Sequence, residues 1–137
     1  MKSTLSHIQF NIDFKHVDFY TDLMKFLGWA EIYAADGVVG YNDSTDKGAS
    51  IWFLKSKTTD MHGHGKAGMN HIGIHVDTQS DVDSVVGYIK DKNIKTLYDT
   101  PRHRPEFAFV EGNTYYQVMF ESPDKILFEV VYTGPKN

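Results

Sequence analysis

The chain of 137 residues contains no cysteine. This absence excludes a disulfide framework, a thiolate metal site and a cysteine nucleophile. Any metal ion must therefore be bound by histidine and carboxylate side chains. The chain has seven histidines, but this number alone is weak evidence for a site.

The sequence also lacks a basic block and a long hydrophobic run. Lys and Arg together number 14 against 18 Asp and Glu, a net charge of -4, which disfavours nucleic acid as a partner. No segment approaches the about 20 apolar residues of a membrane span, and the apolar run at the amino terminus is too short and interrupted for a signal peptide. We therefore expect a cytoplasmic protein that contacts neither nucleic acid nor membrane.

The first half of the chain is predicted to form one strand, one helix and three further strands. Residues 6–12 alternate between apolar and polar, as in a half-buried strand, and apolar residues recur at helical spacing over residues 17–27. Gly28 stands where a left-handed helix cap would fall. Three short apolar runs follow, at residues 30–34, 38–41 and 50–55, with an Asp-Gly hairpin signal after the first and a polar loop at 42–48 after the second.

The second half repeats this pattern. The segment NHIGIHV matches SHIQFNI, which makes His71 the counterpart of His7. A helix is expected from an N-cap at Ser80, with Asp83 three residues later, followed by short strands at 94–97 and 107–110. The chain ends in a predicted hairpin, residues 115–132.

These halves predict one α+β domain, residues 1–137, made of two paired βαβββ modules that form a curved mixed sheet. Module one spans about residues 4–57, the linker 58–68 and module two 69–134. Within the linker, His62 and His64 could bind a metal, but solvated imidazoles on a flexible connector are the favoured interpretation.

Glu129 is the only charged residue in the last strand, where both faces are otherwise apolar. An ionised carboxylate buried without a partner is costly, so such residues are normally paired, protonated or bound to a cation. A strand histidine by itself is more often a structural residue than a ligand. Here His7 and His71 stand at equivalent positions, and with Glu129 they form a candidate facial triad for one divalent ion. The ligand set is compatible with Mn, Fe, Co, Ni or Zn.

His75 shares a face with His71. It lies two residues, or about 6.6–7 Å, further along the strand, which is too far to bind the same ion. We therefore expect it to contact the substrate or to support the metal ligands.

The chain resembles the vicinal oxygen chelate superfamily, which includes glyoxalase I, extradiol dioxygenases, fosfomycin-resistance thiol transferases and bleomycin-binding proteins. The resemblance is carried by His7 in HIQFNI, FLGW at 26–29, His71 in NHIGIHVD, and YYQVMFESPDKILFEVVY with Glu129. It implies a divalent metal bound by His7, His71 and Glu129, and paired modules around a shared cup, commonly assembled as homodimers.

Three positions depart from the family. Matching the last strands of the two modules sets Trp52 against Glu129, so Trp52 stands where glyoxalase I has a fourth ligand. Met119 stands where extradiol dioxygenases have an active-site tyrosine. Lys125 replaces the usual turn glycine, which disfavours a left-handed backbone there.

The loop at residues 101–105 brings together Arg102, His103 and Arg104 between two prolines. A solvated loop is as good an interpretation as a substrate-binding one. The hypothesis is that these residues, with Trp52 and Met119, bind the substrate, and that Tyr116 lines the wall. Glu129, His75 and Tyr116 are the catalytic candidates.

The sequence thus predicts a metal-dependent enzyme in which the ion acts as a Lewis acid on a small oxygen-rich molecule. It leaves open whether the reaction is that of a lyase or isomerase, a thiol transferase or a dioxygenase. The alternative is a binding protein that sequesters a drug or metabolite without chemistry. A bound metal with an open coordination position would favour the enzyme, and an aromatic, metal-free cup the binding protein.

Overall fold

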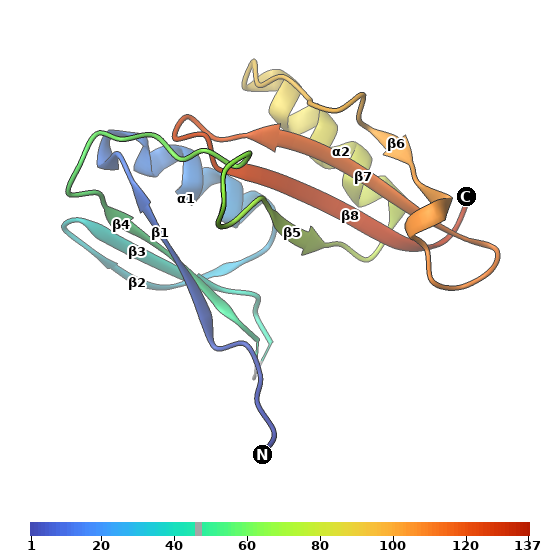
Figure 1. The fold of residues 1–137 in the computed structure, drawn as a ribbon, viewed down its shortest axis with the longest axis horizontal. Helices are drawn as coiled ribbons and strands as arrows, with labels where there is room; N and C mark the ends of the chain where they lie inside the picture. The colour runs from blue at the N-terminus through green and yellow to red at the C-terminus, as the bar shows by residue number, and fades with distance from the viewer. Residues whose placement is uncertain (46–47) are drawn as a thin grey trace. The chain divides into compact units, whose positions relative to one another are not determined.

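The computed structural model describes residues 1–45 and 48–137. Residues 46 and 47, within the predicted loop 42–48, lie outside the described part. The chain divides into two compact units, Met1–Met61 and His62–Asn137 (Figure 1). Their boundary falls inside the predicted linker.

The first unit contains one helix on a four-stranded sheet. Its elements are β1 (His7–Ile12), a 3-10 turn (Phe14–His16), α1 (Val17–Phe26), β2 (Ala30–Ala35), β3 (Val38–Asn42) and β4 (Ser50–Lys55). The strand order is β1-β4-β3-β2, with β1 parallel to β4 and the other neighbours antiparallel. Gly28 and Gly37 have φ of 80° and 78°, as expected for a helix cap and a hairpin turn.

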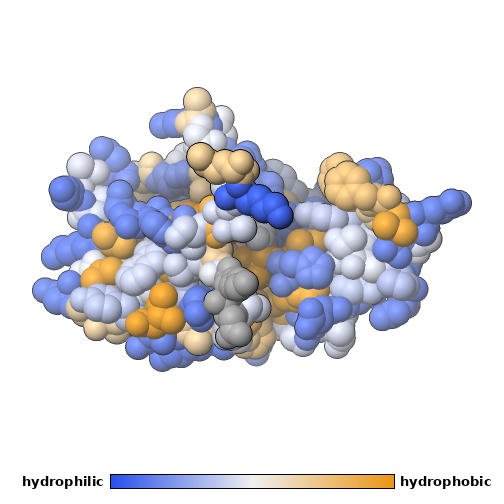
Figure 2. Space-filling view, turned by 90° about the horizontal axis from the view of Figure 1, so that it is seen from below, coloured by the Kyte–Doolittle hydropathy of each residue, from blue (hydrophilic) through white to orange (hydrophobic). Residues whose placement is uncertain are grey.

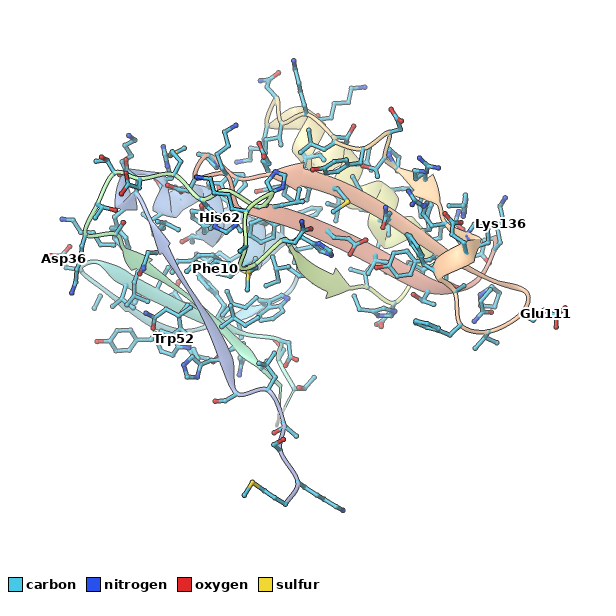
Figure 3. The ribbon with its side chains drawn as sticks, in the orientation of Figure 1. Phe10, Asp36, Trp52, His62, Glu111 and Lys136 are labelled. Atoms are coloured by element: carbon cyan, nitrogen blue, oxygen red, sulfur yellow. The ribbon has the colours of Figure 1, made fainter. Side chains whose placement is uncertain are left out.

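Aromatic packing between α1 and the sheet forms the core of the first unit. Phe53 on β4 is fully buried, and its ring lies 4.4 Å from that of Tyr20 on α1. Phe10 and Tyr41 also contact the Phe53 ring. The residues that alternate with these buried ones, including Trp52, project from the other face of the sheet (Figure 3).

The second unit repeats the same topology. Its elements are β5 (Ile72–His75), α2 (Gln79–Asp91), β6 (Arg102–His103), a 3-10 turn (Pro105–Phe107), β7 (Asn113–Glu121) and β8 (Leu127–Pro135). The order is β5-β8-β7-β6, with β5 parallel to β8. In the view of Figure 1, α2 lies behind β7 and β8. The predicted pair of βαβββ modules is therefore confirmed.

The registers of the two sheets confirm that Trp52 and Glu129 are equivalent. In the first sheet, the residue two positions after His7 pairs with Trp52. In the second sheet, the residue two positions after His71 pairs with Glu129. The repeat thus differs at its most informative position, which holds an indole in one unit and a carboxylate in the other.

Several local expectations for the second unit were wrong. The N-cap of α2 is Thr78, which forms a capping box with Asp81, so the helix begins before Ser80. The expected strand at 107–110 is absent, and its place in the sheet is taken by β6, inside the segment that was expected to be a loop. Residues 94–97 contribute only an isolated bridge between Thr96 and Phe120.

The turn between β7 and β8 does adopt the left-handed conformation. Lys125 has φ of 65°, against the expectation for a side-chain-bearing residue. Backbone hydrogen bonds from Lys125 N to Ser122 O and from Ser122 N to Ile126 O close the turn. The Lys125 ammonium also donates to Glu121, at 3.1 Å. These contacts hold the turn without glycine.

Exposed large hydrophobic residues are scattered over the described surface. The face seen in Figure 2 mixes hydrophilic residues with smaller hydrophobic patches. Phe107, Phe109 and Val110, in the connection between β6 and β7, are among the exposed apolar residues. None of the described helices is long and apolar enough to cross a membrane.

Candidate functional site

The two faces of the second sheet carry different chemistry. The Tyr116 hydroxyl donates to Asp83 on α2 at 2.7 Å, so Tyr116 faces the helix. Side chains alternate along a strand, and Tyr115, Gln117 and Met119 therefore project from the opposite face of β7. Met119 pairs with Glu129 across the strands, which puts Glu129 on that face as well. We call this surface the Glu129 face.

Glu129 is buried and lies close to His71. Glu129 is only 5% exposed, and its Oε2 lies 3.1 Å from His71 Nε2. The structure therefore brings together two of the three predicted metal ligands. Across β5, Gly73 pairs with Glu129, and a Cβ built on Gly73 would stand 3.5 Å from the Glu129 oxygen. The absence of a side chain there leaves room beside the carboxylate.

Asn70 determines which nitrogen of His71 carries the hydrogen. The Asn70 side-chain nitrogen donates to the His64 carbonyl at 3.0 Å, so its oxygen is the atom that faces His71 Nδ1, at 2.8 Å. An amide oxygen only accepts, so Nδ1 must be the donor. In the neutral imidazole, Nε2 is then an acceptor, and it faces a carboxylate oxygen that is also an acceptor.

This donor set fits a divalent ion. Two acceptors that face each other need a cation between or beside them, which is a proton or a metal. Two atoms that bind one ion at about 2.1 Å in perpendicular directions lie about 3.0 Å apart, close to the observed separation. A metal-binding histidine also usually donates its second nitrogen to a carbonyl or carboxylate, as His71 does to Asn70.

Tyr115 forms a further contact with Glu129. Burial, the negative charge of Glu129 and a hydrogen bond to that carboxylate raise the pKa of Tyr115 to about 12. The phenol is therefore a neutral donor to the carboxylate at ordinary pH.

The first unit carries the remaining ligand candidate. His7 is exposed at the start of β1, and its Nδ1 lies 3.2 Å from the Ser6 hydroxyl. On the same face, the Trp52 indole lies over Gly40 and donates to the Ser50 hydroxyl at 2.9 Å. Within neither unit do the described residues gather three His, Asp or Glu side chains around one point. The role of His7 as a ligand stays a prediction from the repeat.

Comparisons with known proteins identify the family to which the chain belongs. The model of the Glyoxalase/Bleomycin resistance protein/Dioxygenase superfamily matches residues 13–130. The chain belongs to this superfamily. An uncharacterized protein, YqjT, from Bacillus subtilis (strain 168) is 30% identical over 66 residues, which is 48% of each chain. The matched segment therefore spans about half the length of that relative.

Solved structures of superfamily proteins share the fold. A glyoxalase candidate from Bacillus halodurans matches with a TM-score of 0.77 at 22% identity, covering 96% of both chains. The fosfomycin resistance protein FosX from Listeria monocytogenes, complexed with Mn(II) and sulfate, matches with a TM-score of 0.67 at 21% identity. That match covers 96% of this chain and 91% of FosX. At these identities the likeness shows the fold alone.

Tyr116 and His103 lie away from the Glu129 face. Tyr116 bonds to Asp83 on α2, and the His103 ring lies 4.4 Å from the Tyr116 ring. His103 Nδ1 is 3.0 Å from the Thr114 hydroxyl. Burial and the charge of Lys136, which follows β8 (Figure 3), lower the pKa of His103. The expectation that Tyr116 lines the wall of the site is therefore wrong, because its neighbour Tyr115 occupies that face.

The two arginines of the predicted loop have different surroundings. Arg102 pairs with Gln117 across β6 and β7, so it projects from the Glu129 face. Arg104 contacts two residues near it in the sequence. Its Nε lies 2.6 Å from Glu106, and its guanidinium lies 4.7 Å from the centre of the Phe107 ring. The Phe107 and Tyr115 rings in turn form an edge-to-face pair, with 5.8 Å between their centroids. The segment is thus a packed strand and turn, not a solvated loop.

The other predicted residues of this face are placed by the strand register. Met119 is buried directly opposite Glu129. His75 is exposed and pairs with Val131, two residues beyond Glu129. This agrees with the expected separation of His75 from the metal ligands.

His64 is not a solvated linker residue. Its Nε2 lies 2.8 Å from Glu121 at the end of β7. Burial alone would raise the pKa of Glu121, but hydrogen bonds from Lys125 and His64 outweigh it and lower the pKa. The contact fixes the connector just before Asn70 and His71.

Sequence reasoning missed Asn70, Tyr115 and Gln117. Period-2 alternation along YYQVMFE could have placed Tyr115 and Gln117 on the face of Met119, once the pairing of Met119 with Glu129 was known. The position of Asn70 directly before His71 could have indicated a contact between the two side chains. Its amide orientation, however, depends on the His64 carbonyl, which only the folded connector supplies.

The contacts of Tyr116 predict a loss of stability in alkali. Burial and the hydrogen bond to Asp83 raise the pKa of Tyr116 to about 12. Because the neutral phenol is favoured in the folded state, its contribution is complete below about pH 10, the pKa of free tyrosine, and is lost between there and about pH 12. Urea unfolding at pH 9, 10 and 11 should show this decline. In Tyr116→Phe the free energy of unfolding should fall less steeply between pH 9 and pH 11. If it falls as steeply as in the unchanged protein, the decline does not come from Tyr116.

Proposed function

We propose that this protein is a divalent-metal-dependent enzyme that acts on a small oxygen-rich molecule. The observation that carries the proposal is the approach of His71 Nε2 to Glu129 Oε2 at 3.1 Å, with Asn70 accepting from His71 Nδ1. His7 is the third ligand that the internal repeat supplies. When bound, the ion would act as a Lewis acid that polarises a substrate oxygen and stabilises developing negative charge.

The residues around this pair have separate tasks in the proposed mechanism. Asn70 orients the His71 ring, and Tyr115 donates to Glu129, so both ligands are held in place before the ion arrives. Gly73 and the buried Met119 leave the carboxylate flanked by small and apolar groups. His75, exposed further along β5, is available to contact the substrate.

The FosX complex with Mn(II) supports this proposal at the level of the superfamily. Imidazole and carboxylate ligands suit Mn, Fe, Co, Ni and Zn, so the residues do not select the metal. A divalent ion held by these residues would supply Lewis-acid chemistry for isomerisation, thiol transfer or oxygenation. The described side chains are compatible with each of these.

A second candidate is a binding protein that sequesters a flat molecule without chemistry. The observation in its favour is the aromatic surface of the first sheet, where the Tyr33 and Trp52 rings lie 5.9 Å apart. Such surfaces stack on planar ligands. Binding of the ligand with equal affinity to the metal-free and metal-loaded proteins would favour this candidate over the enzyme.

The first test of the proposal is the metal content of the protein. Isothermal titration of metal-free protein with Mn, Co, Ni and Zn should show one ion per chain. Because binding needs deprotonated imidazole nitrogens, affinity should fall as the pH is lowered. His71→Ala and Glu129→Gln should each abolish tight binding, whereas His64→Ala, at the other histidine–glutamate pair, should retain it. If a variant lacking His7, His71 and Glu129 keeps its full metal content, the site is wrong.

Glyoxalase I activity should be at or near background. The isomerase chemistry of that family uses four ligands, one of them a glutamate that moves the proton, and the position that repeats Glu129 is Trp52 here. Loss of a positioned general base typically costs about 10²–10⁴-fold in rate. The assay is turnover of the methylglyoxal–glutathione adduct by metal-loaded protein. Trp52→Glu should strengthen metal binding, and ordinary enzymatic rates in the unchanged protein would mean that another carboxylate serves as base.

We further propose a homodimer, because the first sheet leaves a strand edge uncovered. All six residues of β2 are exposed, including Ile32 and Tyr33 at 46% and 50%. Exposed edges of this kind are normally covered or charged. Light scattering should give twice the chain mass at micromolar concentration. Ile32→Lys, on β2, should shift the protein towards monomer. Val110→Lys, at an exposed site in the connection between β6 and β7, should not. A monomer in the unchanged protein would refute the dimer.

A further inference from the structure

A cavity lies at the carboxyl end of α2, away from the Glu129 face. Its volume is about 400 Å³, within the range of small-molecule sites in proteins. Its walls come from the last turns of α2 and from the segment that connects α2 to β6 (Figure 1). The bond between Tyr116 and Asp83 shows that α2 covers the sheet face opposite to Glu129. The cavity is therefore separate from the candidate metal site.

Apolar side chains form one part of the lining. Val86 on α2 and Ile94 in the connection are half-buried, and Pro101 closes the far end of the segment. Val86 stands one helical turn before Lys90, so both side chains lie on the side of α2 that borders the cavity. Small-molecule sites are typically apolar with a few polar groups that fix the orientation of the ligand. The lining thus suits a ligand with an apolar body.

The connection that closes the cavity is fixed to β7 at two points. Leu97 N donates to Met119 O at 2.8 Å, and Met119 N donates to the Thr100 hydroxyl at 2.9 Å. Between these points Tyr98 and Asp99 have φ of 57° and 54°. Two consecutive left-handed residues with side chains are unfavourable, and they persist only where the surrounding contacts hold them. The cavity is therefore a preformed feature of the fold.

Two lysines at the cavity carry charge that no carboxylate neutralises. Lys90 comes from α2 and Lys95 from the connection. Within residues 1–45 and 48–137 neither ammonium has an ion pair within 4.0 Å, whereas Lys92 lies over the Tyr88 ring. No Asp or Glu of the described chain lines the cavity. In a chain with a net charge of -4, this is a local concentration of positive charge.

The helix dipole accounts for only one of these lysines. Cations are favourable in the last turn of a helix, where Lys90 stands, but Lys95 lies four residues beyond the end of α2 at Asp91. Asn93 and Thr96 also line the cavity, and their side chains make no hydrogen bond among the described residues. The polar side of the cavity thus offers two cations and two further hydrogen-bonding groups to a ligand.

We propose that this cavity is a second binding site, which takes a small amphipathic acid with one ring or a short chain as its apolar body. The apolar body lies against Val86, Ile94 and Pro101, and the carboxylate accepts hydrogen bonds from Lys90 and Lys95. The site needs no metal ion. It goes beyond the proposed function, because its ligand does not contact the Glu129 face.

The test uses phenylacetate and hexanoate, each compared with its uncharged amide, phenylacetamide and hexanamide. The probes are added to the whole, metal-free protein. Backbone amide signals of residues 93–96 should shift on titration with at least one acid, and the same titration gives the dissociation constant. The amide of that acid should bind several-fold more weakly, because it keeps the shape of the acid but lacks the charge that the lysines recognise.

Substitutions locate the ligand. Lys90→Gln and Lys95→Gln should each weaken binding of the acid about three- to fivefold, the upper part of the range for exposed charge pairs. The matched control is Lys92→Gln, which removes the same charge beside the cavity and should change affinity less than about twofold. Val86→Phe should also weaken binding, because the larger ring fills the cavity. The lysine variants decide the test even if Val86→Phe does not fold, since both lysines are exposed.

The site and the proposed function can fail separately. His71→Ala should lose the metal and bind the acid unchanged, whereas Lys90→Gln and Lys95→Gln should keep normal Mn affinity. The site is refuted if neither acid shifts the signals of residues 93–96, if the amides bind as tightly as the acids, or if Lys92→Gln weakens binding as much as the other two lysine variants. Loss of acid binding in His71→Ala would place the ligand on the Glu129 face and would also refute the site.

Discussion

The arrangement of the candidate site depends on the burial of one carboxylate. Glu129 stands in the middle of a sheet among apolar residues, where an unpartnered charge would be strongly destabilising. Its nearby polar partners are the His71 imidazole and the Tyr115 phenol. Each of these is held in turn, His71 by Asn70 and Tyr115 by its contact with Phe107. The other residues of the site are therefore arranged around the Glu129 carboxylate, whose burial requires polar partners.

The two units show how a repeated fold can differ in chemistry at one position. The parallel pairing of first and last strands puts Trp52 and Glu129 at the same place in their sheets. The backbone accepts both, but for different reasons. Trp52 needs Gly40 beneath its ring, since a Cβ there would approach the indole within 2.7 Å, whereas Glu129 lies opposite Met119 and needs a polar partner. One unit thus offers an aromatic surface and the other a buried carboxylate.

Tyr115 and Tyr116, which are adjacent on β7, lie on opposite faces of the second sheet. Tyr115 and Tyr116 have nearly the same raised pKa, yet one contacts Glu129 and the other Asp83 on α2. The same alternation divides Arg102 from His103 on β6. Arg102 and Gln117 consequently share a face with Glu129, whereas His103 and Tyr116 help to attach β6 and β7 to the helix. Residues that are neighbours in the sequence of β6 and β7 therefore belong to two different surfaces, the Glu129 face and the face against α2.

The sequence by itself determined the βαβββ repeat, the equivalence of Trp52 and Glu129, and the choice of His71 and Glu129 as partners. These follow from hydrophobic periodicity, from the match of NHIGIHV with SHIQFNI, and from a charge in an apolar strand, which are all local patterns. Only the tertiary structure decided which tyrosine faces Glu129, that Arg102 and His103 form a strand, and that His64 binds Glu121. Those outcomes depend on strand register and on contacts between residues distant in sequence, because a shift of one residue exchanges the two faces of a strand. The orientation of the Asn70 amide is of the same kind, since the His64 carbonyl reaches it only after the connector has folded.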